Sequence, residues 1–361
     1  MGIKYLTYNH QNIDARVPFE TTASSMVEID AGVTGDLKSI GIDGSIFFHA
    51  YYRTYIDPYE SDREEASMIH NVKYISDIIK GYILRILHYF GKSCGDPVII
   101  YLVMDDAPPV KKNRNISKTQ SAYSQVPKPN RKNLLNLIYK ALHDEYNGGN
   151  TRVLTNLNRK SKEGEIELYS FTRRIRSSSF NTRHVIVSCD SDLVAMMIFH
   201  TDPSLVIISP ICGNAYILNY NMVKSGLSLS DYQLQMYTLL HFIFFGSDYN
   251  VGMVMASKNK HDIILDSVKK GVTDVNQIGN QFTRKKSAEA EKETPEYLEN
   301  LKKELMHEAV CAAKYYASLG NETYLKNSPL LYLDTSFNYS QHLPQISFAE
   351  KNNVNINPLT C

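Results

Sequence analysis

Apolar residues follow strand and helix spacings in alternation over the first two thirds of the chain. From residue 71 to residue 90 they recur every three or four positions, which predicts a helix with one buried face. Residues 97–104 form a continuous apolar run, typical of a strand that is buried on both faces. Strands alternating with helices favour an α/β fold whose central sheet is parallel and carries helices on both faces. The same patterns predict further strands at 38–42, 184–188 and 205–209 and further helices at 131–146, 166–175, 192–200 and 231–245.

Other stretches of the chain depart from this alternation. Residues 108–129 and 150–162 contain few apolar anchors, so we expect both segments to project from the sheet. Beyond residue 279 the sequence becomes more charged, and residues 289–318 have the spacing of a charged helix. We therefore expect one domain over residues 1–279 and a helical C-terminal extension over residues 280–361.

Composition limits the class of protein. The chain has 361 residues, of which 43% are hydrophobic and 21% charged, as in an ordinary soluble globular protein. No apolar run reaches the ~18 residues of a membrane helix, and the N-terminus lacks the apolar core of a signal peptide, so we expect no membrane partner. The five cysteines form no Cys-x-x-Cys pair, which argues against a zinc site or a disulfide framework and fits a reducing compartment.

Positive charge is concentrated in one stretch, although the formal net charge is only +1. Residues 107–143 contain eight basic residues and no acidic one. A local basic patch of this kind is typical of nucleic-acid contact, and a solvated loop is the alternative that the charge run leaves open. The basic residues are Lys111, Lys112, Arg114, Lys118, Lys128, Arg131, Lys132 and Lys140.

Carboxylates follow three of the predicted strands. Asp43 follows the first of them, and Asp105 and Asp106 follow the second. Asp190 and Asp192 follow the third. Because ligands bind at the carboxyl ends of parallel strands, we expect these side chains at one edge of the sheet, where oxygen ligands suit Mg²⁺ or Mn²⁺. A single aspartate after a strand is usually a turn or helix-cap residue, and it is the three strands together that favour a metal site.

Further carboxylates occur in the second half of the chain. Glu163, Glu165 and Glu167 lie in the segment KEGEIEL at a predicted helix start, where the helix dipole also favours acids. On a helix Glu163 and Glu167 share a face, whereas Glu165 and Glu167 share one side only if the chain is still extended at Glu165. Asp248 lies in FFGSDY, directly after a long apolar helix.

Six short blocks, most of them containing these acids, follow one another between residues 1 and 249. They are MGI, GIDGSIFFH, VMDDAPPVKK, EGEIEL, CDSDLVAMM and FFGSDY. In this order the chain resembles the structure-specific 5′ nucleases, which include flap endonucleases and Xrn-type 5′→3′ exoribonucleases. The resemblance implies a PIN-like α/β nuclease fold, a helical arch over about residues 111–162, and two bound divalent cations, Mg²⁺ or alternatively Mn²⁺. The metal ligands that it implies are Asp43, Asp105 or Asp106, Glu165, Glu167, Asp190, Asp192 and Asp248.

The resemblance also implies which side chains contact the nucleic acid. His49 matches a position whose His or Tyr stacks on the terminal base, and a partly buried structural histidine is the alternative. Lys111 and Lys118 lie seven residues apart, close to two helical turns, and match residues that hold the terminal and scissile phosphates during catalysis. Alignment on the Pro-Pro pair selects Lys112 in place of Lys111. Gly2 and Arg114 complete the expected nucleic-acid contacts.

The activity implied is metal-dependent hydrolysis of phosphodiester bonds from a 5′ end by a two-metal mechanism. Residues 181–209 look closer to the Xrn-type enzymes, which favours single-stranded RNA as the substrate. Residues 250–259 lack the glycine spacing with which flap endonucleases grip duplex DNA, so a DNA 5′-flap endonuclease is the alternative within the class.

A non-catalytic nucleic-acid-binding or structural relative is the alternative from another class. The presence of all seven acids argues against it, because like charges held together are costly. The short chain fits a compact, divergent member of the family, viral members included. We expect it in the cytoplasm or nucleus, or in a virion for a viral protein, and the sequence identifies no protein partner.

Overall fold

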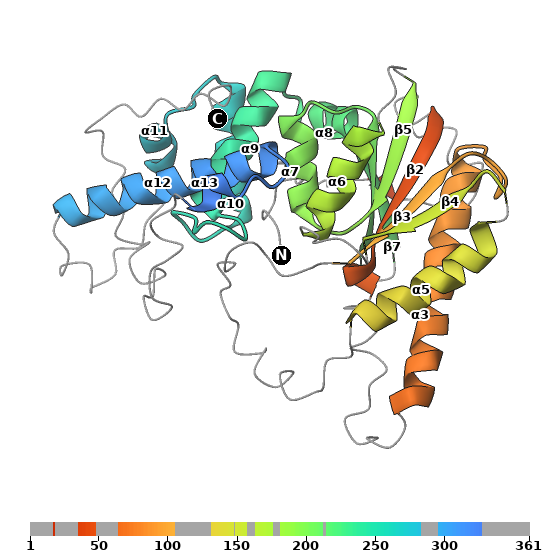
Figure 1. The fold of residues 1–361 in the computed structure, drawn as a ribbon. Helices are drawn as coiled ribbons and strands as arrows, with labels where there is room; N and C mark the ends of the chain where they lie inside the picture. Colours follow the sequence, from red (N-terminus) through yellow and green to blue (C-terminus); the bar gives the residue numbers. More distant parts are fainter. Residues whose placement is uncertain are drawn as a thin grey trace.

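A computed structural model gives the architecture, which is built around one sheet (Figure 1). The residues described are 17–18, 35–47, 64–104, 131–147, 149–156, 163–175, 181–211, 214–282 and 295–326. Within them, seven strands form one sheet in the order β1-β7-β6-β5-β2-β3-β4. The strands are β1 (Val17–Pro18), β2 (Asp36–Asp43), β3 (Ile99–Val103), β4 (Arg152–Thr155), β5 (Thr182–Val187), β6 (Leu205–Ile211) and β7 (Asn214–Asn219).

Most of the sheet is parallel, as the alternation of strands and helices predicts. Strands β6, β5, β2, β3 and β4 all run in one direction. Strand β7 is antiparallel to β6, and β1 is antiparallel to β7. Strand β7 begins three residues after β6 ends, which leaves no room for the crossover that a parallel strand needs. The parallel prediction is therefore confirmed for the centre of the sheet and not for this edge.

The register of the sheet brings three strand ends together. Asp43, the last residue of β2, pairs with Val103, the last residue of β3. On the other side of β2, Ile42 pairs with Val187, the last residue of β5. Side chains that follow β2, β3 and β5 therefore emerge side by side, at what we call the carboxyl edge.

Helices cover both faces of the sheet, with α3 and α5 on one face and α6 and α7 on the other (Figure 1). The buried residues of α3 include Ile75, Ile79, Ile83 and Ile86, whose spacing confirms the helix predicted there. Helix α7 is apolar all round because it lies among α6, α9 and α12. None of the described helices is both long and apolar enough to cross a bilayer. The bounds are α3 (Glu64–Tyr89), α5 (Arg131–Tyr146), α6 (Gly164–Arg174) and α7 (Ser191–Phe199).

The C-terminal helices extend the layer formed by α6 and α7. Helix α12 packs against α9 and α7, and its buried Leu305 and Ala309 belong to the same core as Ile186 of β5. The predicted C-terminal extension therefore shares a hydrophobic core with the part of the chain that carries the sheet. The bounds are α8 (Tyr220–Leu227), α9 (Asp231–Phe245), α10 (Lys258–Lys269), α11 (Val275–Gly279), α12 (Pro295–Ala317) and α13 (Thr323–Lys326).

Part of the segment predicted as an arch belongs to the body of the protein. Helix α5 packs on α3, and β4 pairs with β3 at the edge of the sheet. The expectation that residues 150–162 project from the sheet is wrong at β4, because Val153 packs into the core below α5. Residues 105–130 and 157–162 lie outside the described residues, so the arch stays a prediction there.

Candidate metal centre

Two carboxylates stand at the beginning of α7, directly after β5. Asp190 is the N-cap residue, and its Oδ1 accepts a hydrogen bond from the backbone N–H of Asp192 at 3.1 Å. Asp192 lies in the first turn, where the helix dipole favours a negative charge. A cap engages one oxygen of its carboxylate, so capping by Asp190 is compatible with a second role for the same side chain.

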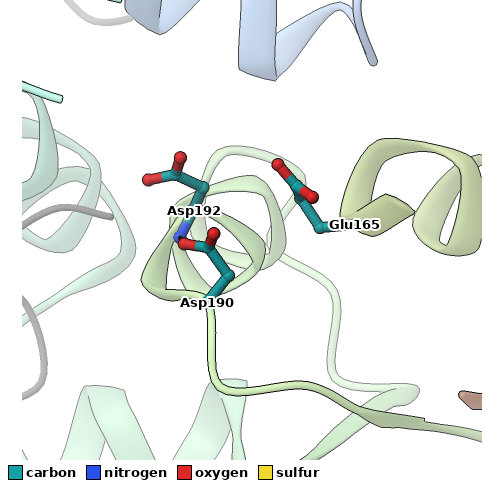
Figure 2. A group of neighbouring side chains, drawn as sticks. All are labelled: Glu165, Asp190 and Asp192. Atoms are coloured by element: carbon teal, nitrogen blue, oxygen red, sulfur yellow. Dashed lines mark hydrogen bonds between the residues drawn. The ribbon is translucent and has the colours of Figure 1, made fainter. Parts of the chain in front are cut away.

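A third carboxylate joins them from α6. Glu165 lies in the first turn of α6 and is buried. One oxygen from each of Glu165, Asp190 and Asp192 lies within 4.8 Å of the other two. Figure 2 shows the three side chains converging from the starts of the two helices. The structure therefore brings together three of the acids that the sequence analysis selected, one from KEGEIEL and two from the segment after β5.

Asp192 is the most deeply buried member of this group, with no exposed surface. Burial is the main cause that raises the pKa of its carboxyl group well above the ordinary value, and the charges of Asp190, Asp248 and Glu163 act in the same direction. A hydrogen bond donated by the Tyr316 hydroxyl to Oδ2 at 2.5 Å opposes the shift. Asp192 Oδ1 is buried and accepts no hydrogen bond from the residues that the structure describes.

Asp43 lies at the neighbouring strand end, on the same carboxyl edge. Its Oδ2 accepts a hydrogen bond from the Ser188 hydroxyl at 3.0 Å, and its Oδ1 accepts one from the backbone N–H of Ser45 at 3.0 Å. Desolvation, followed by the charges of Asp43 and Asp190, raises the pKa of the Cys189 thiol to about 11. One thiol therefore lies within the electrostatic reach of both carboxylates, as expected for strands that end side by side.

Asp248 is positioned by a tight turn after α9. Gly246 has a φ of 78°, and a Cβ atom there would lie 2.6 Å from the carbonyl oxygen of Asn250, so the turn requires glycine. The Ser247 hydroxyl donates a hydrogen bond to Asn250 Oδ1 at 2.7 Å and accepts one from the Tyr249 backbone N–H at 3.2 Å. This turn holds Asp248 close enough to Asp192 for the charge of Asp248 to raise the pKa of Asp192.

Sequence reasoning left out of the predicted site three residues that surround the carboxylates. Glu163 precedes α6, is buried, and acts on Asp192 through its charge. Tyr315 and Tyr316 come from α12, and their hydroxyls approach Glu163 at 3.4 Å and Asp192 at 2.5 Å. The letters EGE correspond to Glu163 and Glu165, so the motif itself contained the signal for Glu163. No local pattern identifies the tyrosines, because they lie more than 120 residues further along the chain.

Glu167 lies outside the group of three carboxylates. Its Oε1 accepts hydrogen bonds from the Tyr101 hydroxyl at 2.8 Å and from the Arg174 guanidinium at 3.2 Å. The reason is helical geometry, because α6 already begins at Gly164 and turns Glu167 away from Glu165. The pairing of Glu165 with Glu167 required an extended chain at Glu165, and that condition is not met. A metal role for Glu167 stays a prediction without support from this geometry.

Several predicted site residues fall outside the described residues. For Asp105 and Asp106, the structure describes only the preceding Met104, whose backbone carbonyl accepts a hydrogen bond from the Asn156 amide at 2.9 Å. The metal role of Asp105 or Asp106 therefore stays a prediction. The same holds for the nucleic-acid contacts. The nucleic-acid residues concerned are Gly2, His49, Lys111, Lys112, Arg114 and Lys118.

The chemistry of the site fits a hard divalent cation. The donor atoms of Glu165, Asp190 and Asp192 are all carboxylate oxygens, which Mg²⁺ and Mn²⁺ prefer. Holding three carboxylates this close is unfavourable unless a positive charge or protons compensate for their repulsion. A buried oxygen such as Asp192 Oδ1 also costs free energy when nothing binds it. These residues can therefore hold a divalent cation of the kind that prefers oxygen ligands.

The chain is similar to several proteins of known structure. No family model matches the chain, and no curated protein matches it. It is similar to the catalytic core of Rad2 in complex with DNA substrate, with a TM-score of 0.42 and 14% identity over 83% of this chain and 81% of that one. It is similar to T5 5′-exonuclease with bound zinc (TM-score 0.40, 13% identity, 82% and 98% covered). It is also similar to flap endonuclease-1 from Methanococcus jannaschii (TM-score 0.33, 15% identity, 81% and 94% covered).

Proposed function

We propose that the chain is a divalent-metal-dependent nuclease that hydrolyses phosphodiester bonds from the 5′ end of single-stranded nucleic acid, with RNA preferred. The observation that carries the proposal is the convergence of Glu165, Asp190 and Asp192 at the carboxyl edge. Support comes from the sequence blocks, because three of them place acids at or after the ends of β2, β3 and β5.

Glu165, Asp190 and Asp192 would hold one cation. Further ligands under a two-metal mechanism would be Asp43, Asp105 or Asp106, and Asp248. Bound divalent cations supply a Lewis acid that activates water and neutralises charge on a phosphodiester. The products would carry a 5′ phosphate and a 3′ hydroxyl.

The protein's own residues set the conditions for this chemistry. The carboxylates repel a phosphodiester when no cation compensates them, so substrate binding needs positive charge elsewhere. The acid-free basic stretch over residues 107–143 begins just after Asp106, and we propose that its lysines supply this charge. The capping of α7 by Asp190 and the hydroxyl of Ser188 on Asp43 fix two of the acids before any substrate binds.

Mapping the products of defined substrates tests the proposal. The protein is incubated with 5′-phosphorylated single-stranded RNA, the matching DNA strand and a 5′-flap DNA, each with Mg²⁺, with Mn²⁺ and with chelator. We expect products released from the 5′ end of the RNA, and no cleavage with chelator. Preferential release of the flap would replace the exonuclease proposal with the flap endonuclease alternative. Cleavage that persists in chelator, or no cleavage of any substrate, would contradict the proposal as a whole.

A further inference from the structure

Helix α12 places two adjacent tyrosines against acids of two different elements. The Tyr316 hydroxyl donates a hydrogen bond to Asp192 Oδ2, at the start of α7, at 2.5 Å. The Tyr315 hydroxyl donates one to Glu163 Oε2, just before α6, at 3.4 Å. Neighbouring residues of one helix therefore reach the acids that precede or begin the two helices forming the site. We call Tyr315 and Tyr316 the tyrosine pair.

The surrounding packing holds the tyrosine pair in place. The ring of Tyr249 lies 4.9 Å from that of Tyr315 and 5.9 Å from that of Tyr316, measured between ring centroids. The Tyr316 ring also contacts Phe242 of α9 at 5.7 Å. All of these rings are buried. Because close-packed aromatic rings have little freedom to rotate, the hydroxyl positions are set by the core and not by the acids.

The two oxygens of Asp192 are treated differently by this arrangement. Tyr316 occupies Oδ2, whereas Oδ1 is buried and accepts no hydrogen bond from the described residues. Asp192 is also one of the three acids whose oxygens converge within 4.8 Å. A fixed donor on one oxygen sets the rotation of the carboxylate and leaves its other oxygen for a cation.

We propose that Tyr316 is a positioning residue of the metal site, which orients Asp192 so that a single oxygen is available to a divalent cation. Tyr315 supports this arrangement by holding Glu163, the acid just before α6, through a weaker contact. This inference rests on the proposed metal-dependent function and extends it to α12. The opposing explanation is that the pair simply anchors α12 to the core. The two explanations differ in what loss of one hydroxyl does to metal affinity.

The test is Tyr316→Phe, which removes the hydroxyl and keeps the ring. Mn²⁺ binding to the full chain is measured by calorimetry without nucleic acid. Loss of a residue that orients a metal ligand typically weakens metal affinity by roughly 10–100-fold, and we expect a loss in this range. The matched control is Tyr237→Phe on α9, which removes another buried hydroxyl, hydrogen-bonded to His261 Nδ1 at 3.0 Å. The control is expected to lower the melting temperature and leave Mn²⁺ affinity unchanged.

Cleavage measured against Mn²⁺ concentration gives a second readout. We expect the half-saturating Mn²⁺ concentration of Tyr316→Phe to rise by the same factor as its dissociation constant. At saturating Mn²⁺, kcat is expected to recover most of the wild-type value, and KM for the nucleic acid to stay unchanged. A purely structural role would instead lower the melting temperature without moving the metal requirement.

Three results would overturn the inference. Wild-type Mn²⁺ affinity in Tyr316→Phe would do so while leaving the proposed function intact, and so would an equal loss of affinity in Tyr237→Phe. Absence of Mn²⁺ binding by the wild-type chain would overturn both the proposed function and this inference. If Tyr316→Phe does not fold, Tyr315→Phe tests the pair instead, with a smaller loss of Mn²⁺ affinity expected and an unchanged affinity contradicting the proposal.

Discussion

The two faces of the sheet bury very different side chains. On one face, α3 and α5 bury residues such as Ile83, Ile138 and Leu142, and none of their described charged side chains is buried. On the other face, the layer of α6, α7, α9 and α12 buries Glu165 and Asp192 among its apolar residues. It also buries Glu163, Lys302 and Glu308.

The buried charged side chains of the second face are not explained by packing alone. Buried charges lower stability unless they are paired or hydrogen-bonded, so a layer selected only for packing would exclude them. Lys302 meets this requirement through Glu299 Oε2 at 2.7 Å and Asn276 Oδ1 at 3.0 Å. The acids at the carboxyl edge have hydroxyl donors and a converging geometry instead. The α3/α5 face buries only apolar and uncharged groups among its described side chains, whereas the layer of α6, α7, α9 and α12 also buries carboxylates whose repulsion a cation or protons must compensate.

The largest expected effect is on cleavage, from Asp192→Asn or Asp190→Asn. Either change keeps the shape of the side chain and removes a negative ligand, so we expect the rate to fall by about three orders of magnitude, roughly 4 kcal/mol of transition-state stabilisation. The measurement is single-turnover cleavage of a 5′-labelled strand at saturating Mg²⁺. The control is Asp231→Asn, which alters a surface ion pair with Lys224 and should leave the rate nearly unchanged. Full activity in both site variants would remove the distinction between the two faces.

The next effect concerns stability on the opposite face. Ile83→Ala deletes a fully buried side chain of α3 and should lower the free energy of unfolding by about 2–5 kcal/mol. Denaturant unfolding of the metal-free protein measures this. Its matched control is the adjacent Leu84→Ala, because Leu84 is 47% exposed and its loss should change stability by less than about 0.5 kcal/mol. If the two variants lost equal stability, α3 would not be packed as described.

Metal-dependent stabilisation sharpens the comparison further. At an Mn²⁺ concentration 100 times the dissociation constant, the folded wild-type protein should gain about 2.7 kcal/mol, because the unfolded chain lacks the assembled site. Ile83→Ala should gain the same amount from its lower starting point, and Asp192→Asn should gain much less. Thermal melts with and without Mn²⁺ measure the gains. An equal gain in all three proteins would place the responsible site away from these carboxylates.

The smallest effect is expected at the start of β2. The pKa of Asp36 is lowered by hydrogen bonds from Lys38 and Lys92, with distances of 2.6 and 2.9 Å. The pKa of Asp36 in the folded protein lies below the unfolded value of about 3.8. The two ion pairs therefore stabilise the fold above pH 3.8, and this stabilisation is lost as the pH falls through the folded pKa. Asp36→Asn should cost about 0.2–1 kcal/mol at pH 7, and less in acid, because the carboxylate is 44% exposed. A loss that grew on acidification would contradict this sign.

The sequence predicted those parts of the molecule that depend on local spacing. The period of α3, the apolar run of β3 and the acids after β2 and β5 were recognisable because each follows from neighbouring residues. The antiparallel β7 and the edge strand β4 were not, because tertiary pairing and short connections decide them. Within the site, Glu165, Asp190 and Asp192 were predicted to meet. Glu167 lies outside the group of three carboxylates because of where α6 begins, and the exact end of a helix is its least predictable property.

The distance in sequence between Asp192 and Tyr316 has a consequence for biosynthesis. The two residues are 124 positions apart, and a ribosome adding ~5–20 residues each second needs roughly 6–25 s to travel from one to the other. During that interval the strands and α7 of the nascent chain can form, while α12 and its tyrosine pair have not yet been synthesised. The carboxylates are then open to water, and their mutual repulsion opposes early closure of this layer. Folding of the α6/α12 face is therefore a late event of synthesis, and the α3/α5 face can be complete long before it.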